Sequence, residues 1–399
     1  MSCLMLQIGG GGLLNVCSML SLLLLLFPLP VRWSAPIRIR LLVRIAVDMS
    51  ESQRLWLPVG ADSNLTAADS HQTRSQKEFP FGDPLKTVTA PLTTPPPNPG
   101  ETKKTIQFKV GEEVGEKSQW NVLKKLGEGA FGAVYLVKGN TEETQYALKV
   151  EAETDPRKLL RMEVYALREL GKKRVQDRGH FVEMKDKGHI PGKYYYIVMT
   201  LVGESLQDLR AKQPLKKFSM GTAISVSRQC LEAIEDLHKN GFLHRDIKPG
   251  NYMVGRRELS QLRKVFIIDF GMCRKFTKDD GSTLRNPRGR AGFRGTVKYA
   301  SIACHVAREH WLYQTVEVTC GKLPWRNIKD MDEVGKFKKD CKEARQKCLF
   351  GGCPREYAKI FPILDKGKFF DEPDYAAIFK LLDDAMVHTH SKDSVYDWE

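Results

Sequence analysis

The chain has 399 residues, which is enough for one large two-lobed domain with tails or for two or three small domains. Its 63 Lys and Arg residues against 48 Asp and Glu residues give a formal net charge of +15, which favours anionic partners such as phosphates, acidic peptides, nucleic acid or a membrane surface. The nine cysteines form no CxxC pair and have no regular ligand spacing, so they argue against a cysteine metal site and predict free thiols in a reducing compartment.

Residues 1–48 form an apolar leader that has no charged side chain before Arg32 and contains the apolar run 19–27. A secretory signal peptide places its basic residues before the apolar run, whereas here they follow it. Residues 13–31 approach the roughly 20 residues that span a bilayer, although an asparagine and two prolines interrupt them. Three interpretations stay open: a disordered or wrongly assigned segment with translation starting at Met49, a membrane anchor, or a targeting sequence.

Residues 49–117 are polar and include the proline-dense run 90–100, with no helical or alternating apolar pattern. We expect a disordered linker there. From about Trp120 the composition changes to apolar segments separated by single Gly or Pro residues, and no internal repeat is evident. The folded domain is therefore predicted to occupy residues 118–399.

Residues 122–150 predict three strands, because their β-branched and aromatic segments are separated by turn residues. Between the first two strands lie Gly127, Gly129 and Gly132. A loop without Cβ atoms lets backbone amides approach phosphate oxygens closely, although such a loop is also compatible with an ordinary glycine turn. Lys149 lies in the third strand within an apolar run, and a buried lysine needs an anionic partner.

A helix is predicted next, with Asp155 as its N-cap, Pro156 at its first position and Gly171 as its stop. Glu163 lies on the apolar stripe of this helix. A carboxylate on an apolar face is either paired or has a strongly perturbed pKa. An ion pair with Lys149 explains Glu163 more economically than an isolated structural glutamate does.

Residues 193–203 predict a further buried strand that ends at a glycine and connects into a second lobe. Two helices are expected there, at residues 205–212 and 220–240. The second is long, carries apolar residues at helical spacing and ends before Gly241.

The segment GFLHRDIKPGN, residues 241–251, follows this helix directly and concentrates polar residues. In it, Asp246 can accept the proton of a hydroxyl nucleophile, Lys248 can neutralise a transferring phosphoryl group, and Asn251 can hold a Mg²⁺ ion. Asp269 ends a buried strand beside a glycine turn, where a carboxylate is a natural metal ligand or an ordinary strand terminus.

The glycine-rich loop, strand Lys, helix Glu, HRDxKxxN segment and Asp-Phe-Gly turn occur in the order and separations of the protein-kinase signature. The chain from residue 118 onward therefore resembles a eukaryotic protein kinase. HRDIKPGN, GFRGTVKYAS, GKLPWRNIKDMDEVG and the terminal DWE are similar to the casein kinase 1 superfamily, especially its tau-tubulin kinase branch and nematode relatives. The resemblance implies an α+β, two-lobed kinase fold, with a β-rich N-lobe at 118–201 and a mainly helical C-lobe at 202–399.

The resemblance also implies transfer of the ATP γ-phosphoryl group to Ser and Thr hydroxyls of protein substrates, with Mg²⁺ neutralising the phosphates. Met199 would lie at the gate of the base pocket. The implied catalytic residues are Asp246, Lys248, Lys149 and Glu163, and the implied Mg²⁺ ligands are Asn251 and Asp269. The implied ATP-binding residues are Gly127, Glu128, Gly129, Ala130, Phe131, Gly132, Val134, Ala147, Lys149, Met199, Thr200, Leu201 and Val202.

One segment departs from the family pattern: residues 301–325 contain no Asp, and Ala303 stands where Asn is usual. In the family, an Asp-containing motif opens the central C-lobe helix and hydrogen-bonds the backbone of the HRD loop. The sequence therefore predicts an internal deletion near residues 308–312, with about two helical turns lost. The chain is then either a catalytically impaired, kinase-like binding module that lacks an exon, or an enzyme in which His310 and its neighbours have taken over the anchoring role.

The loop at residues 284–298 is basic and faces the peptide in kinases. It predicts an anion site that favours acidic or phosphate-primed substrates, or else a solvated basic loop. A role in nucleic-acid binding is disfavoured, because the basic residues do not cluster with exposed aromatics. We expect a cytoplasmic monomer, with the nucleus as an alternative location and membrane attachment only through the leader. The basic residues of the loop are Arg285, Arg288, Arg290, Arg294 and Lys298.

Overall fold

The chain divides into two units, Met1–Ser75 and Gln76–Glu399, in the computed structural model. In the first unit, the described residues form an antiparallel hairpin of β1 (Met5–Ile8) and β2 (Gly12–Asn15), and the rest of the predicted leader lies outside the described residues. No helix in the described ranges combines the length and the apolar character that crossing a bilayer requires. The structure describes residues 5–8, 12–15, 106–117, 119–129, 132–172, 178–278, 280–286, 293, 295–300, 308–367, 370–392 and 394–399.

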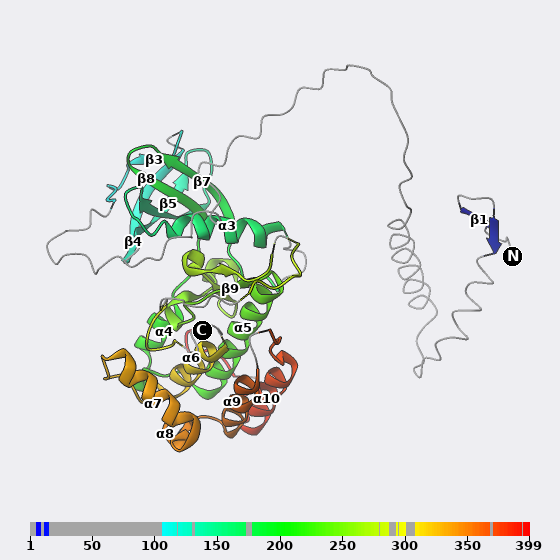
Figure 1. Cartoon of the computed structure of the whole chain (residues 1–399). Coiled ribbons are helices and arrows are strands. Elements are labelled where there is room, and N and C mark those ends of the chain that lie inside the picture. Colours follow the sequence, from blue (N-terminus) through cyan, green and yellow to red (C-terminus); the bar gives the residue numbers. More distant parts are fainter. Residues whose placement is uncertain are drawn as a thin grey trace. The chain divides into compact units, whose positions relative to one another are not determined.

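The N-lobe of the second unit is built on a six-stranded antiparallel sheet with the order β3-β4-β5-β6-β8-β7 (Figure 1). The three strands predicted for residues 122–150 are confirmed. Alternate residues of β8 face opposite sides: Ile197 packs in the core shared with the C-lobe, and Val198 packs in a separate N-lobe cluster. The strands are β3 (Glu113–Val114), β4 (Trp120–Gly129), β5 (Gly132–Gly139), β6 (Gln145–Ala152), β7 (Met184–Ile190) and β8 (Tyr194–Thr200).

Residues 106–117, which the sequence assigned to the linker, lie against this sheet. The Tyr135 hydroxyl donates to the carbonyl of Ile106 at 3.1 Å and accepts from the amide of Phe108 at 3.2 Å. The rings of Phe108 and Tyr135 also lie 5.1 Å apart between centroids. These contacts move the start of the folded part from residue 118 to residue 106.

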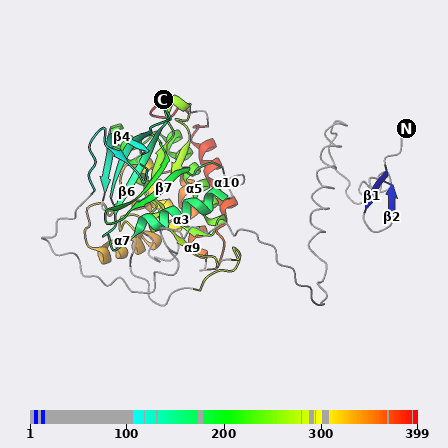
Figure 2. The same ribbon diagram turned by 90° about the horizontal axis from the view of Figure 1, so that it is seen from above.

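Helix α3 (Leu159–Lys172) packs beside the sheet (Figure 2), and its start differs from the predicted one. Asp155 does not cap the helix, because its carboxylate accepts from the amide and guanidinium of Arg157 in the preceding turn. The first helical amides instead donate to the buried carboxylate of Glu151, at 2.9 Å from Leu159 and 3.4 Å from Leu160. The cap of α3 is therefore the side chain of Glu151 from the neighbouring strand β6, and not the Asp155 side chain that the local sequence predicts.

The C-lobe is mainly helical, as expected, and contains short strand pairs beside the catalytic loop. Side chains of Ser205 and Ser219 cap α4 and α5 by accepting amide hydrogen bonds in the first turn. The helices are α4 (Leu206–Lys212), α5 (Met220–Lys239), α6 (Arg308–Cys320), α7 (Met331–Glu343), α8 (Gln346–Phe350), α9 (Arg355–Lys366) and α10 (Tyr375–His388). The short strands are β9 (Phe242–Leu243), β10 (Tyr252–Val254), β11 (Val265–Ile267) and β12 (Arg274–Lys275).

Helix α6 occupies the region for which the sequence predicts a deletion. It runs unbroken through residues 308–320 and packs against α5 and α9. Trp311, Leu312 and Tyr313 are each at most 1% exposed, and the Trp311 indole donates to the carbonyl of Ser227 at 2.9 Å. Residues 301–307, which precede α6, lie outside the described residues. The loss of about two helical turns stays a prediction.

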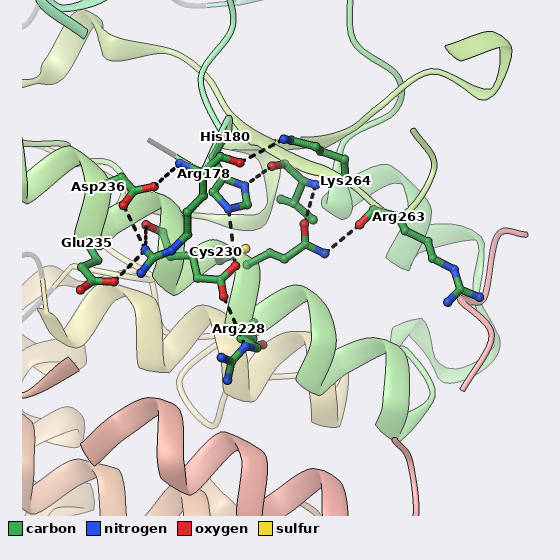
Figure 3. Close-up of polar contacts among 12 residues, drawn as sticks. Arg178, His180, Arg228, Cys230, Glu235, Asp236, Arg263 and Lys264 are labelled. Atoms are coloured by element: carbon green, nitrogen blue, oxygen red, sulfur yellow. Dashed lines mark hydrogen bonds and ion pairs between the residues drawn. The ribbon is translucent and has the colours of Figure 1, made fainter. Parts of the chain in front are cut away.

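Residues 178–180, which precede β7, are bound to α5 and β11 by a polar network (Figure 3). Arg178 forms ion pairs with Glu235 at 2.7 Å and with Asp236 at 3.0 Å, and its amide also donates to Asp236. The buried His180 contacts the carbonyl of Val265 at 2.7 Å. This network ties the residues before β7 to the C-lobe.

Replacing Trp311 by Ala tests whether α6 forms the centre of the C-lobe. The variant loses a buried indole and its hydrogen bond, so the free energy of unfolding should fall by about 3–5 kcal/mol. Val387 on α10 is 68% exposed, and Val387→Ala should change the same quantity by less than about 0.5 kcal/mol. Urea unfolding of both variants measures the difference, and equal midpoints would show that α6 is not a core helix.

Candidate functional site

A cavity of about 450 Å³ lies between the sheet and the C-lobe, within the usual size range of small-ligand sites. Its walls come from the glycine-rich turn, from β6 and β8, and from the segments around β10 and β11. The predicted residues that line it are Gly127, Gly129, Gly132, Val134, Ala147, Lys149, Glu163, Met199, Thr200, Leu201, Val202, Asn251 and Asp269. Residues far apart in the sequence are thus brought to one site.

Three of the residues predicted to bind ATP are not placed on the cavity. Glu128 does not line it, because its carboxylate pairs with Lys125 at 2.5 Å on the surface of β4. Ala130 and Phe131 lie outside the described residues. Sequence reasoning missed other lining residues, which are Leu126, Val182, Gly203, Glu204, Ser205, Asp208, Met253 and Ile268.

One of the missed residues carried a signal in the sequence. Met253 stands two positions after Asn251, and side chains two positions apart in an extended segment lie on the same side. The same rule gives no signal for Ile268, which immediately precedes Asp269. No comparable local pattern marked Ser205 or its neighbours.

The turn between β4 and β5 depends on Gly132. Its φ is +139°, and a Cβ there would lie 1.9 Å from the carbonyl oxygen of Val150, so no other residue fits without moving the backbone. Gly127 and Gly129 have open space where a Cβ would stand. At these two positions the absence of a side chain leaves the cavity wall free for a ligand.

Lys149 lies between two carboxylates at the back of the cavity. Its ammonium is 2.6 Å from Glu163 on α3 and 2.9 Å from Asp269. Burial disfavours the charged ammonium, but the two carboxylates outweigh it and raise the pKa of Lys149 above its ordinary value. Burial raises the pKa of Glu163, whereas Lys149 overcomes the effect of burial on Asp269 and lowers its pKa. The predicted ion pair thus includes a third group, and Asp269 is the more firmly ionised carboxylate.

Asp269 adopts the left-handed region with φ of 65°, which is unusual for a residue other than glycine. The following Phe270 is fully buried, with its ring 6.0 Å from Phe181 and 5.6 Å from His244 between centroids. Burial of this ring and the ion pair to Lys149 hold the strained turn, so that the carboxylate of Asp269 points into the cavity.

Asp246 lies at the centre of a small hydrogen-bond network. Its carboxylate is 2.6 Å from the ammonium of Lys248 and accepts from the hydroxyl of Thr296 at 2.8 Å. The side-chain amide of Asn251 donates to the backbone carbonyl of Asp246 at 2.8 Å. Three of the predicted site residues are therefore held together, and Thr296 is a partner that the sequence did not reveal.

The backbone of the catalytic loop is supported by His244 and Arg245. Burial lowers the pKa of His244, so its imidazole is neutral. One ring nitrogen, Nε2, donates to the carbonyl of Ile268 at 3.0 Å, and Nδ1 accepts the amide of Asp246 at 3.3 Å. The Arg245 guanidinium donates to the carbonyls of Met272 and Cys273. The loop is thus joined to the segment that carries Asp269.

The side-chain oxygen atoms of Asn251 and Asp269 suit a hard divalent cation that is bound together with phosphates. Asn251 and Asp269 present oxygen atoms to the same cavity as Lys149, and Mg²⁺ sites in phosphoryl-transfer enzymes use one or two protein oxygen ligands beside the substrate phosphates. Across the described ranges, no group of three or more His, Cys, Asp or Glu side chains is arranged to hold a metal by protein ligands alone. The six described cysteines are free.

Comparisons with known proteins agree with this geometry. A family model of the protein kinase domain matches residues 120–310. The chain is 33% identical over 303 residues to a protein of Dictyostelium discoideum named a probable serine/threonine-protein kinase. The aligned region covers 74% of this chain and 59% of that relative, so the chain spans less than two thirds of that relative's length. It is 32% identical to serine/threonine-protein kinase spe-6 of Caenorhabditis elegans, covering 72% and 77% of the two chains. It is 28% identical to casein kinase I homolog 2 of Schizosaccharomyces pombe, covering 70% and 65%.

The buried Glu151 at the start of α3 predicts a dependence of stability on pH. Burial raises its pKa to about 7 from an ordinary value of 4.5. Because the folded protein holds this proton more tightly than the unfolded chain, the free energy of unfolding falls as the pH rises from 4.5 towards 7. Glu151→Gln keeps an acceptor for the helix amides but cannot titrate, so its free energy of unfolding lacks this decrease. The difference in free energy of unfolding, variant minus wild type, should therefore increase by up to about 3 kcal/mol between pH 4.5 and 7.

Urea unfolding at several pH values between 5 and 8 measures this difference. Glu143→Gln, in the exposed turn between β5 and β6, removes the same charge and serves as the control. Parallel stability profiles for the wild type and Glu151→Gln would contradict the prediction.

Proposed function

The chain belongs to the serine/threonine protein kinases, and we propose that it transfers the γ-phosphoryl group of ATP to Ser and Thr residues of proteins in the manner of casein kinase 1. The observation that carries this proposal is the alignment of two ionic clusters at one site. Lys149 is held by Glu163 and Asp269 at the back of the cavity, and Asp246 is paired with Lys248 beside it.

In the proposed mechanism, Asp246 orients the acceptor hydroxyl and accepts its proton. Lys248, already 2.6 Å from Asp246, lies where it can neutralise negative charge on the transferring group. Thr296 fixes the other carboxylate oxygen of Asp246, so the base is held in one orientation. Most of the rate enhancement then comes from positioning and charge stabilisation, as is usual in phosphoryl transfer.

The nucleotide would bind in the cavity, with its phosphates beneath the turn that contains Gly127 and Gly129. Glu163 keeps the ammonium of Lys149 directed into the cavity, where it can contact those phosphates. Asn251 and Asp269 would hold Mg²⁺, which when bound supplies positive charge that neutralises the phosphate oxygens.

Substrate preference is a finer part of the proposal. Arg288, Arg290 and Arg294 lie outside the described residues, and they carry the proposed preference for acidic or phosphate-primed substrates. Lys298 was predicted to join them, but its ammonium contacts the buried carboxylate of Glu317, so its charge is already balanced. The anion site is therefore assigned to the arginines of the loop.

The remaining finer proposals rest on the sequence. The likeness of the four family-like segments supports our proposal that the chain is related to the tau-tubulin kinase branch. We further propose that the chain acts as a cytoplasmic monomer whose partners are protein substrates, with residues 49–105 as a linker between the leader and the kinase domain.

A catalytically impaired, kinase-like binding module is the second candidate function, and the absence of an Asp from residues 301–307 favours it. In that case the catalytic loop would lack an anchor from the start of the central helix, and each buried backbone group left without a partner would cost roughly 1–3 kcal/mol. The contacts of His244 and Arg245 support the loop from the opposite side and favour the active enzyme.

Asp246→Asn separates the two candidates. In the active enzyme, the wild-type protein phosphorylates a Ser/Thr substrate with ATP, and the variant should lose at least about 100-fold in rate because it lacks the base. Its dissociation constant for Mg·ATP should change by less than about twofold, since Asp246 does not line the cavity. Radiolabelled phosphate transfer and titration with Mg·ATP measure both quantities. A wild-type protein that binds Mg·ATP without transfer would favour the binding module.

The basic loop predicts faster phosphorylation of phosphate-primed and acidic peptides than of a neutral peptide, by about tenfold at low salt. Replacing Arg288 and Arg290 by Gln should remove most of this preference. Replacing Lys359 and Lys380 by Gln alters net charge equally at exposed positions on α9 and α10 and should leave the preference intact. Equal wild-type rates on the three peptides would exclude an anion-selective loop.

A further inference from the structure

Residues 295–300 include the last part of the basic loop and lie next to Asp246. Thr296 donates its hydroxyl to the Asp246 carboxylate at 2.8 Å. Gly295 has φ of +106°, and a Cβ there would lie 2.5 Å from the carbonyl oxygen of Arg245. This close approach means that any displacement of the segment is transmitted to the catalytic loop.

Glu317 on α6 supports this segment from the interior. It is 2% exposed, and its two carboxylate oxygens contact the ammonium of Lys298 and the hydroxyl of Tyr299. Burial and the neighbouring Glu317 raise the pKa of Tyr299, so its hydroxyl remains a donor. The Arg210 guanidinium lies 3.8 Å from the same carboxylate. This buried carboxylate therefore holds the Lys298 and Tyr299 side chains in place.

Lys338 on α7 supports the same segment through its backbone. Its side chain is buried, with 3% of its surface exposed, and it donates to the carbonyls of Val297 at 2.8 Å and Ala300 at 2.6 Å. Its ammonium also lies 5.2 Å from the ring of Trp325, whose indole nitrogen donates to the carbonyl of Lys298 at 2.8 Å. Three carbonyl acceptors of the segment are thus fixed by side chains from the C-lobe interior.

The carboxylate that holds this segment does not come from the neighbouring sequence. Between Tyr299 and Glu309 the chain has no acidic residue that could anchor the segment by itself. The carboxylate is that of Glu317 on α6, and a cation additional to Lys298 is supplied by Lys338 on α7. Neither Glu317 nor Lys338 lines the nucleotide cavity.

We propose that Glu317 and Lys338 are positioning residues that hold residues 295–300 against Asp246 and thereby set the affinity for the protein substrate without affecting that for ATP. Glu317 fixes the side chains of the segment, and Lys338 fixes its backbone. This inference rests on the proposed function, in which Asp246 orients the acceptor hydroxyl. Because Thr296 of this segment contacts Asp246 at 2.8 Å, loosening the segment disturbs the place of the acceptor hydroxyl, while the nucleotide cavity keeps its shape.

Kinetics of Glu317→Gln and Lys338→Met in the full chain test the proposal. Each variant should raise the KM for a peptide substrate by about tenfold and change the KM for ATP by less than about twofold. Lys338→Arg keeps the positive charge and donors and should recover part of the loss. Asp384→Asn breaks the exposed pair with Lys380 on α10 and is the control for loss of a charge. Equal increases in both KM values, or effects no larger than that of the control, would overturn the proposal.

Hydrogen–deuterium exchange supplies a readout that does not require turnover. In Glu317→Gln and Lys338→Met, amides of residues 295–300 should exchange at least about tenfold faster, while those of β5 and β6 keep the wild-type rate. Tyr299→Phe removes one contact of Glu317 and should give a smaller increase, which covers the case in which a stronger variant unfolds. Unchanged exchange in residues 295–300 would overturn the proposal even if the wild-type chain binds Mg·ATP without transferring phosphate.

Discussion

The site depends on the buried ammonium of Lys149. A lysine within a sheet has to be compensated by anions, and the two that compensate it come from α3 and from the turn after β11. One charge therefore connects the sheet, the helix beside it and the C-lobe. A second set of contacts joins Arg178, which precedes β7, to Glu235 and Asp236 on α5 (Figure 3). The ion pairs of Lys149 set the charge at the back of the cavity.

The loop around Asp246 is held by several weak contacts. The chain has no carboxylate in the residues just before α6, yet Asp246 contacts Lys248, Thr296 and Asn251. Each of these hydrogen bonds contributes little net stability, but together they define a single orientation of the carboxylate.

Sequence reasoning recovered the strands, most helices and the residues that meet at the cavity, because their chemistry lies in short motifs. It misplaced the start of α3, since the capping carboxylate of Glu151 comes from a strand and not from the local sequence. Contacts such as Thr296 to Asp246 join residues 50 positions apart and depend on how the chain folds back, which no local pattern reveals.

Each lobe contains a glutamate and a lysine that are largely buried and hold neighbouring groups in place. In the N-lobe, Glu163 holds Lys149 at the cavity in which we propose that the phosphates bind. In the C-lobe, Glu317 holds side chains and Lys338 holds backbone carbonyls of the segment beside Asp246. Buried ionic groups are poor sources of net stability, because desolvation offsets most of their attraction. Their retention at these two places is therefore better explained by geometry than by stability. A phosphoryl-transfer site needs the donor and the acceptor held independently, and a separate buried charge cluster for each allows one to be altered without displacing the other.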